Sequence, residues 1–403
     1  MINDDMFAPE VMADPYSYYG RLRAQEPVHW NAKYEMWVIT RYDDVVWLIR
    51  HPELFSNEFF KKDPRPPYPA IDEADLGLYE YVRGYQGDQF IHRDPPDHTA
   101  MRRVIHGYFT PKAMEAWRSY VRSAINELLD RVENLGRMDV MRDFATPLPL
   151  WVISEMMGVP PQDRPYLRQL TEKLLYIARG EPYRMRPLSE GMRGMIEYVN
   201  PLVEQRLKEP GSDFISVLAQ GEKDGILTRH QVLVNTSLLL LGGHETTINL
   251  VCNGTLAFLR HPEQWERLKR DPAGEAERAT EECLRYDSPL KSIQRIAAQD
   301  VEMRGKVLRK DERLRYFITG ANRDPEKFSE PDTFDIGRHP NPHVAFGSGV
   351  HHCLGATLGR LEGQEAFRAL AERFPSLRLE TEALEYHPSI AQRSLKSLPV
   401  VWG

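Results

Sequence analysis

The ten residues Phe346–Gly355 (FGSGVHHCLG) place a thiol in a backbone suited to tight turns. Gly347 and Gly349 allow conformations that a residue with a Cβ resists. Cys353 stands just before Ala356–Phe374, where apolar residues recur at helical spacing. A thiolate at a helix start faces unpaired backbone N–H groups and the positive end of the helix dipole, and both favour the anion. The position therefore suits a nucleophile, a redox-sensing thiol or a metal ligand.

The residues around Cys353 follow the pattern FGxGxHxCxG, and all six fixed positions of this pattern are filled. The pattern resembles the haem-binding signature of the cytochrome P450 family. The resemblance implies that Cys353 is the thiolate ligand of a haem iron, in haem b (iron protoporphyrin IX). It also assigns Phe346, Gly347, His351 and Gly355 to the haem-binding loop.

Two histidines and two arginines resemble the family's contacts to the haem propionates. His98 and Arg102 are four residues apart in DPPDHTAMRR, so on a helix they share one face and can hold a carboxylate together. In the family this pair contacts a propionate. Arg295, in the strand-like SIQRIA, and His351 match the remaining propionate contacts.

A long helix is predicted to begin at a capping box formed by Thr228 and Gln231 and to end before Pro262. Gly242 and Gly243 lie in its middle, where each glycine costs about 1 kcal/mol relative to alanine. Close approach of a flat macrocycle and a local opening of the backbone hydrogen-bond ladder would account for them.

The same helix carries Glu245 and Thr246, an acid followed by an alcohol. The resemblance places the oxygen-binding groove at Gly242 and implies that Glu245 and Thr246 deliver protons there. The alternative for Thr246 is a hydroxyl that only bonds back to the carbonyl of Gly242, four residues earlier.

Glu282 and Arg285 stand three residues apart in EECLRYDSP, a spacing that permits an ion pair on one helix face. The pair matches the family's ExxR element, and Arg338 in FDIGR matches the arginine that completes a buried triad. The implied role is structural: these residues hold the segment that leads into the Cys353 loop.

Several polar or thiol groups fall outside these motifs. His352, beside the ligand, is expected to be an exposed spectator. Lys291, in SPLKSIQR, either meets an anionic substrate or extends its amine to solvent, as long lysines usually do. Cys252 and Cys283 lie in helical apolar patterns and are expected to be buried and inert.

The elements that position these residues are mainly helices, with a smaller β part. The resemblance implies the cytochrome P450 fold, with haem between the long oxygen-binding helix and the helix after the Cys353 loop. A proline-rich segment, Phe59–Asp97, is expected to form a covering loop with one short helix. Helical spacing marks Pro111–Val132, Pro147–Met157, Leu167–Ile177, Gly191–Leu207 and Ala356–Phe374. A hairpin over Val28–Thr40 and strands at Val301–Met303, Val307–Leu308 and Leu398–Val401 are expected to form one modest sheet.

Composition indicates one globular unit over residues 1–403. The chain is 41% hydrophobic and 28% charged, and no linker or repeat divides it. Its net charge of −7 gives no basic field for nucleic acid. The start of the sequence lacks the basic and apolar parts of a signal peptide, and no stretch approaches the roughly 20 apolar residues of a membrane span. A cytoplasmic location without a membrane or nucleic-acid partner is expected.

The resemblance implies a monooxygenase that inserts one oxygen atom from O2 into a small organic substrate. The thiolate favours cleavage of the O–O bond. The chain shows no flavin-type GxGxxG and no cysteine set for an iron–sulfur cluster. NAD(P)H electrons are thus expected from a ferredoxin- or flavodoxin-type partner, or from a fused reductase. The alternatives are a peroxide-driven peroxygenase and a haem-binding sensor without turnover.

Overall fold

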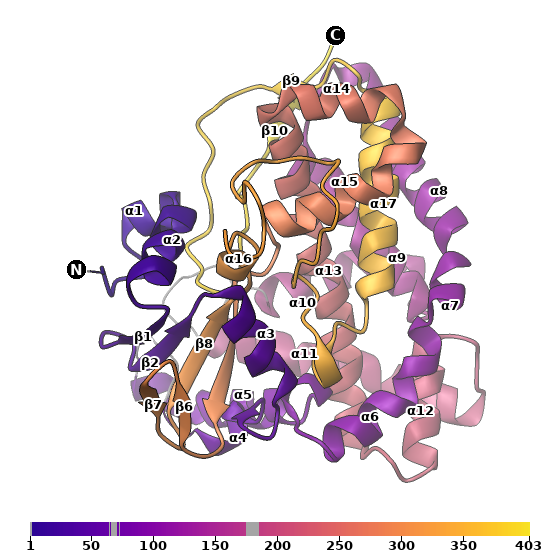
Figure 1. Cartoon of the computed structure of the whole chain (residues 1–403). Coiled ribbons are helices and arrows are strands. Elements are labelled where there is room, and N and C mark those ends of the chain that lie inside the picture. Colours follow the sequence, from indigo (N-terminus) through magenta and orange to yellow (C-terminus); the bar gives the residue numbers. More distant parts are fainter. Residues whose placement is uncertain (1, 64, 66–70, 72, 175–184) are drawn as a thin grey trace.

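Helices dominate the molecule, and most of them lie to one side of a small sheet, on the right in Figure 1. The computed structural model describes residues 2–63, 65, 71, 73–174 and 185–403. The α-helices are α1 (Pro9–Ala13), α2 (Pro15–Gln25), α3 (Tyr42–Arg50), α4 (Phe59–Lys62), α5 (Leu76–Gly87), α6 (Asp97–His106), α7 (Pro111–Glu115), α8 (Arg118–Asp130), α9 (Pro147–Met156), α10 (Arg164–Leu174), α11 (Met185–Lys208), α12 (Phe214–Lys223), α13 (Arg229–Arg260), α14 (Pro262–Arg270), α15 (Pro272–Tyr286), α16 (Ile318–Ala321) and α17 (Ala356–Arg373).

The largest sheet joins strands from both ends of the chain. Its order is β1 (Val28–Asn31), β2 (Met36–Ile39), β8 (Arg313–Phe317), β5 (Ser292–Ala297) and β3 (Phe55–Ser56). The pair β2 and β8 is parallel, and the other pairs are antiparallel. In β5, Ile293 and Arg295 point to one face because side chains alternate along a strand.

The prediction of one sheet is wrong, because the described strands form three. β6 (Val301–Met303) and β7 (Lys306–Leu308) make a separate hairpin. The C-terminal strand β10 (Pro399–Val401) pairs with β4 (Arg137–Asp139) and β9 (Arg378–Leu379) instead. Strand type is readable from local composition, but pairing depends on segments distant in the sequence.

Helix α13 has the predicted boundaries. The Thr228 hydroxyl accepts from the backbone N–H of Gln231, and the Gln231 side chain accepts from the N–H of Thr228. The helix ends at Arg260, directly before His261 and Pro262. It runs as one continuous α-helix through Gly242 and Gly243, without the predicted local opening.

Two predicted segments differ in detail. Pro111–Val132 is not one helix: the N–H of Trp117 bonds to the carbonyl of Met114, and this tight turn separates α7 from α8. The segment Phe59–Asp97 holds two α-helices, of which α5 has 12 residues, so it is more helical than predicted. Its residues 64, 66–70 and 72 lie outside the described part, as does the end of the predicted Leu167–Ile177 helix.

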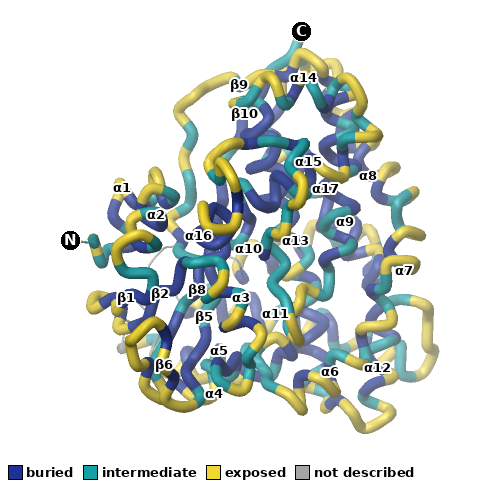
Figure 2. The backbone as a smooth tube through the Cα atoms, in the orientation of Figure 1, coloured by how far each residue is buried: buried dark blue, intermediate teal, exposed yellow. Residues whose placement is uncertain are grey.

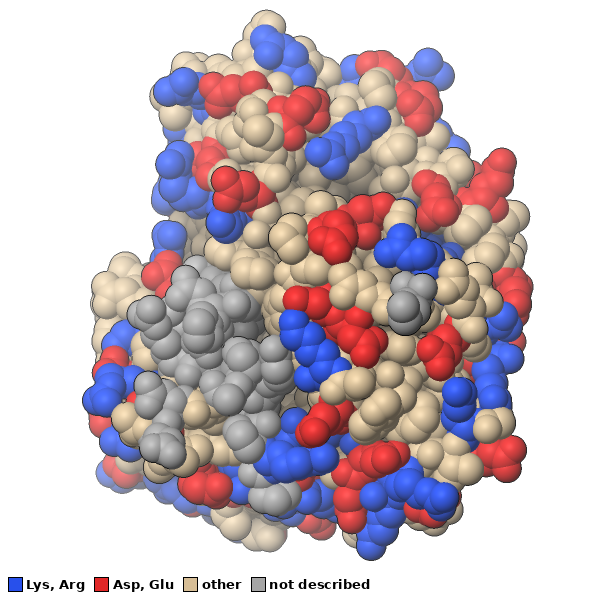
Figure 3. All heavy atoms as spheres, turned by 90° about the vertical axis from the view of Figure 1, so that its left-hand side faces the viewer, with Lys and Arg blue, Asp and Glu red and all other residues tan. Residues whose placement is uncertain are grey.

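The core lies between α13, α15 and α17, which pack on one another and are dark blue over much of their length in Figure 2. Cys252 on α13 and Cys283 on α15 are buried in it, as predicted. Burial raises the pKa of both thiols well above the ordinary range, so both remain protonated and unreactive. On the face shown in Figure 3, basic and acidic side chains are interspersed, with no field of one sign.

Candidate active site

A cavity lies between α13, β5 and the loop that precedes α17. It leaves about 730 Å³ free of protein atoms, including its open mouth. Thr246 lines it from α13 and Arg295 from β5, while Phe346, Gly347, His351 and Cys353 line it from the loop. The remaining wall is mostly apolar and comprises Ile49, Thr247, Leu250, Leu284, Pro289, Leu290, Ile293, Tyr316, Ala345 and Gly359.

Cys353 is the accessible cysteine of the three and faces this cavity. Its loop turns at Gly347 and Gly349, whose φ values of 65° and 69° favour glycine. The N–H of Cys353 donates to the carbonyl of Phe346, 2.9 Å away, which closes the loop. Surrounding protein atoms displace water and raise the pKa of the thiol, opposed by a backbone bond at Gly355 and by nearby arginines. The helix start alone therefore does not ionise the thiol, whereas coordination to a metal does.

Two histidines meet beside the loop with unused nitrogen atoms. The rings of His98, on α6, and His351 lie 4.0 Å apart between centroids. Both nitrogens of His98 and Nε2 of His351 are buried and form no hydrogen bond to the described residues. Burial, followed by the charge of Arg102, lowers the pKa of His98 to about 4. Burial also lowers the pKa of His351 strongly. Both rings are therefore neutral, and each can donate one N–H hydrogen bond.

The two predicted arginines lie in the same region. Arg102 donates to the carbonyl of His352, 2.6 Å away, which ties α6 to the loop. Arg295 lines the cavity and donates to the carbonyl of Gln294 at 2.7 Å and to the hydroxyl of Tyr316 at 3.3 Å. The structure thus brings all four predicted propionate contacts to one side of the cavity.

On α13, the predicted acid and alcohol point in different directions. The Thr246 hydroxyl donates to the carbonyl of Gly242, 3.0 Å away, and its side chain lines the cavity. Glu245 is buried, and its Oε2 accepts a hydrogen bond from Nε2 of Gln392. Outside its own helix, no described heavy atom lies within 4 Å of where a Cβ on Gly242 would stand.

Glu282, Arg285 and Arg338 meet in the interior, in the arrangement that the family resemblance implies. Glu282 and Arg285 are both 0% exposed and form a bidentate pair with two N–O distances of 2.8 Å. Arg338 reaches Glu282 at 3.3 Å. Arg285 also donates to the carbonyls of Asn322, Pro331 and Thr333, in the segment that leads to the Cys353 loop.

Lys291 does not reach solvent, so that alternative is wrong: the residue is 2% exposed. Its N–H and that of Ser292 both donate to the carbonyl of Ala391, at 2.8 and 3.4 Å, which forms a bulge. Leu290 and Ile293, on either side of the bulge, line the cavity instead. Burial lowers the pKa of Lys291 to about 7. His352 is exposed, as predicted.

Sequence reasoning missed three residues near the site. His92 carries a pKa that burial lowers to about 4, and Arg295 lies close enough to lower it too. Gln392 bonds to Glu245. Glu362, on α17, is 1% exposed and accepts from the Thr247 hydroxyl at 3.3 Å, and burial raises its pKa to about 8. Glu362 alone had a signal, a carboxylate on the apolar face of the predicted helix.

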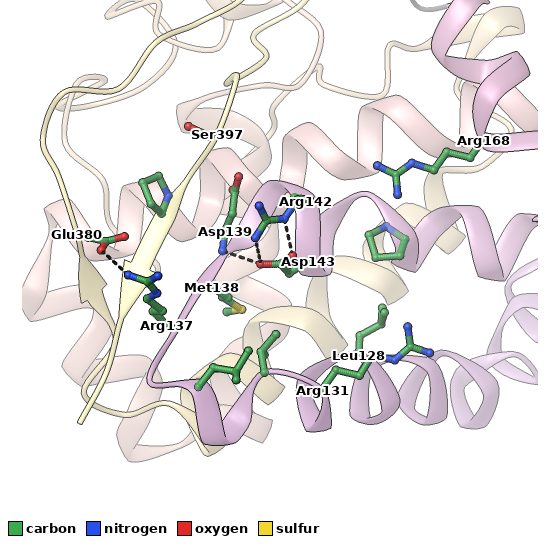
Figure 4. Close-up of a pocket in the computed structure, with 14 residues that line it drawn as sticks. Leu128, Arg131, Arg137, Met138, Asp139, Arg142, Asp143, Arg168, Glu380 and Ser397 are labelled. Carbon is green, nitrogen blue, oxygen red and sulfur yellow. Dashed lines mark hydrogen bonds and ion pairs between the residues drawn. The ribbon is translucent and has the colours of Figure 1, made fainter. Parts of the chain in front are cut away.

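A second concavity lies beside β4 and β10 (Figure 4), an open groove that leaves about 1770 Å³ free of protein atoms, including open solvent. Its arginines are paired locally: Arg142 with Asp143 at 2.7 Å, and Arg137 with Glu380 at 3.7 Å. None of the predicted site residues lines it.

The cavity fits a haem in its donor set. Cys353 supplies a soft ligand from the loop, and Thr246 and Leu250 line the cavity from α13. The unpaired nitrogens of His98 and His351, with Arg102 and Arg295, provide donors for anionic groups at the edge. Apolar side chains make up most of the rest.

Comparison with known proteins agrees with this geometry. The family model described as Cytochrome P450 matches residues 276–393. Cytochrome P450 CYP107DY1 of Priestia megaterium is 40% identical, over 99% of this chain and 98% of its own length. The chain belongs to the cytochrome P450 family. The 6-deoxyerythronolide B hydroxylase of Saccharopolyspora erythraea is 34% identical over 98% of both chains. A crystal structure of P450BioI in complex with an acyl carrier protein ligated to hexadec-9Z-enoic acid has a TM-score of 0.88 and 34% identity, covering 98% of this chain and 99% of that one.

Membership of this P450 family makes the protein a haem-containing monooxygenase that acts on an organic substrate with O2 and a redox partner. In the part of the chain that the structure describes, no helix is both long and apolar enough to cross a membrane.

Proposed function

We propose that residues 1–403 form one haem domain in which Cys353 ligates the iron of haem b. The observation that supports this most strongly is the meeting of Cys353, Thr246 and Arg295 around one cavity, although these residues lie far apart in the sequence. Among the described residues, the largest of three apolar clusters also joins helices from α5 to α17 with β4 and β10. Bound there, a haem with a thiolate ligand supplies the chemistry of dioxygen activation.

His98, Arg102, Arg295 and His351 hold the haem propionates in this proposal. The neutral imidazoles donate N–H groups that the described protein leaves unused, and the arginines add charge. Phe346, Gly347 and Gly355 shape the loop around the ligand, while the open space at Gly242 would let the cofactor approach α13 closely. Glu282, Arg285 and Arg338 fix the segment that leads into the loop.

Glu245 and Thr246 move protons along α13, from the buried acid to the hydroxyl that lines the cavity. Because the Thr246 proton is engaged by the Gly242 carbonyl, its oxygen presents lone pairs to the cavity and can hold a water by accepting from it. The bond from Gln392 fixes the orientation of the Glu245 carboxyl, which exchanges protons as a general acid. This pair supports the monooxygenase reading over peroxide-driven turnover.

The substrate occupies the apolar end of the cavity, beside Thr246. Leu250, Leu290 and Ile293 line that part of the wall, which suits a largely hydrocarbon molecule. The molecules named for two relatives are 6-deoxyerythronolide B and hexadec-9Z-enoic acid ligated to an acyl carrier protein, and both have this character. Electrons arrive from a ferredoxin- or flavodoxin-type partner drawing on NAD(P)H, in the cytoplasm.

The ligand assignment is tested with the ferrous carbon monoxide complex, whose red-shifted Soret band reports a thiolate opposite the gas. Cys353→Ala is expected to abolish the band, while Cys252→Ala and Cys283→Ala keep it. Retention of the band in Cys353→Ala, with loss in either control, overturns the assignment. Product formation with a surrogate reductase then separates a monooxygenase from a sensor.

A further inference from the structure

Helix α13 buries a polar stripe next to the proposed proton-delivering pair. Glu245, Asn249 and Asn253 recur every four residues, so they lie along one face of the helix. They are 9%, 0% and 1% exposed, respectively. Carboxylate and carboxamide groups at such depth are costly unless each polar atom finds a partner.

The chain segment at Gln392 and Arg393 covers this stripe. At one end, Nε2 of Gln392 donates to Glu245. At the other end, Nδ2 of Asn253 donates to the carbonyl of Arg393 at 3.0 Å and to that of Asp287 at 3.4 Å. Asn249 is one turn from each of these contacts and therefore faces the same seam between α13 and the segment.

Polar atoms along the seam lack partners. The Asn249 carboxamide forms no hydrogen bond to any described residue, at either Nδ2 or Oδ1. On its two sides, Oε1 of Gln392 and Oδ1 of Asn253 also form none to the described chain. One donor group and three acceptors, all buried along one seam, match the two to four polar partners of an internal water.

We propose that Asn249, with Gln392 and Asn253, holds buried water along this seam, and that this water returns protons to Glu245. The inference rests on the proposed role of Glu245. When the Glu245 carboxyl passes a proton toward Thr246, the adjacent water gives one proton to the carboxylate and takes one from its neighbour. One proton thus enters from the end near half-buried Asp287 for each proton that leaves, and no group is oxidised or reduced. Asn249 is a positioning residue in this scheme.

The first test needs no turnover. Leucine has the branching and the number of side-chain heavy atoms of asparagine, but it is larger and cannot bind water, so Asn249→Leu separates a wet seam from a dry one. In a wet seam, leucine expels the water and leaves Gln392 and Asn253 unsolvated, so the unfolding temperature falls below that of the wild type. In a dry seam, leucine relieves an unpaired buried amide and the unfolding temperature rises, which overturns the inference. A high-resolution crystal structure of the haem-loaded protein is expected to show water bonded to Asn249; density excluding water there also overturns it.

The matched control is Thr255→Val. Thr255 is 1% exposed on α13, and its hydroxyl also lacks a hydrogen bond to the described residues, but it lies on a different face of the helix. Replacing the Thr255 hydroxyl by a methyl group removes a buried unpaired group and leaves the seam between α13 and the Gln392 segment unchanged. The unfolding temperature is therefore expected to stay level or rise.

The second test measures oxygenated product per electron pair. Asn249→Leu is expected to lower this ratio about ten-fold, the size of effect seen when a residue that supports a catalytic group is removed. Peroxide and the solvent deuterium isotope effect both increase, whereas Thr255→Val behaves as wild type. Asn249→Ala, which leaves a space that water can enter, is expected to lose less coupling than Asn249→Leu. An equal loss in both variants, or no loss in Asn249→Leu, contradicts the water path.

The carbon monoxide band separates failure of this inference from failure of the proposed function. A normal band with unchanged coupling in Asn249→Leu, alongside uncoupling in Thr246→Ala, removes the water path and leaves the proposed function in place. Absence of the band from the wild-type protein removes both.

Discussion

The hydroxyl of Thr246 donates to the carbonyl oxygen of Gly242, 3.0 Å away and one helical turn earlier. This is the local bond that a mid-helix threonine commonly makes, and it coexists with a side chain that faces the cavity. The bond therefore does not exclude a role in proton delivery, but determines which atom performs it: the oxygen acts as an acceptor.

We predict that Thr246→Ala uncouples the reaction. NAD(P)H consumption stays within a few-fold of wild type, hydrogen peroxide rises, and oxygenated product per electron pair falls steeply. Nicotinamide, peroxide and product are measured on one sample. Thr236→Ala is the control, because Thr236 makes the same bond, 2.8 Å to the carbonyl of Val232, in the buried first part of α13. Unchanged coupling in Thr246→Ala would reopen peroxide-driven turnover.

Glu245→Gln is predicted to act differently from Thr246→Ala, because it removes the group that exchanges protons. The whole cycle slows, by roughly 10²–10⁴-fold for loss of a general acid. Because the glutamine amide at this position still meets Gln392, the unfolding temperature and haem content serve as checks that the fold is intact. A rate equal to wild type would remove Glu245 from the mechanism.

Glu282→Ala is predicted to destabilise the fold by about 3–5 kcal/mol, because it leaves Arg285 charged and unpaired in the interior. Poor haem loading follows from disorder of the segment leading to Cys353. Glu275→Ala is the matched control on the same helix: Glu275 also pairs with an arginine, Arg267, at 3.0 Å but is partly exposed, so its loss costs about 0–1 kcal/mol. Chemical denaturation measures both, and equal costs would contradict the buried-triad role.

Glu362 is predicted to make the fold less stable as pH rises. Its pKa in the folded protein is about 8, above the ordinary 4.5, so the folded state holds a proton that the unfolded state releases. The contribution of Glu362 to the free energy of unfolding is fully present below about pH 4.5. Between about pH 4.5 and about pH 8 the free energy of unfolding falls by about 1.4 kcal/mol per pH unit. Glu362→Gln is expected to remove this slope, and Glu372→Gln, an exposed change on the same helix, to retain it. Parallel stability profiles for wild type and Glu362→Gln would refute the prediction.

The redox partner is predicted to dock near two exposed cations, Arg103 and Lys112. Arg103 lies on α6, the helix tied to the Cys353 loop, and Lys112 lies on α7, which follows it in the chain. An acidic ferredoxin is attracted there, so reduction by it slows with added salt. Arg103→Glu with Lys112→Glu is expected to slow reduction and flatten the salt dependence. Arg270→Glu, on α14 at the opposite end of Figure 1, is expected to do neither. Salt-insensitive reduction of the wild type counts against electrostatic docking.

The features that the sequence predicted well are those whose residues are close in the chain. The capping box of α13, the ion pair of Glu282 and Arg285, and the turn-forming Cys353 loop each depend on a few neighbouring residues. The fold class followed from these motifs through the family resemblance. That these motifs meet around one cavity could also be predicted only from the resemblance, since spacing along the chain does not indicate that Thr246 and Cys353 lie together.

The features that the sequence did not reveal depend on distant contacts. Gln392 meets Glu245 across 147 residues, and nothing near either residue signals the other. The burial of Lys291 depends on a bulge against Ala391, and the turn at Trp117 contains neither proline nor glycine. Side-chain exposure and strand pairing are set by such contacts, which local patterns do not encode.

The cavity draws its walls from α3, α13, β5 and the loop before α17, and β2 pairs in parallel with β8, matching Met36 to Arg313. A nascent chain therefore holds no complete haem pocket until the Cys353 loop has been synthesised. Before that point α13 and β5 present apolar walls without their thiolate, and the hairpin of β1 and β2 lacks its partner strand β8, whose residues come 277 positions later in the chain. Capture of the cofactor in this cavity therefore requires the Cys353 loop, which is made after α13 and β5.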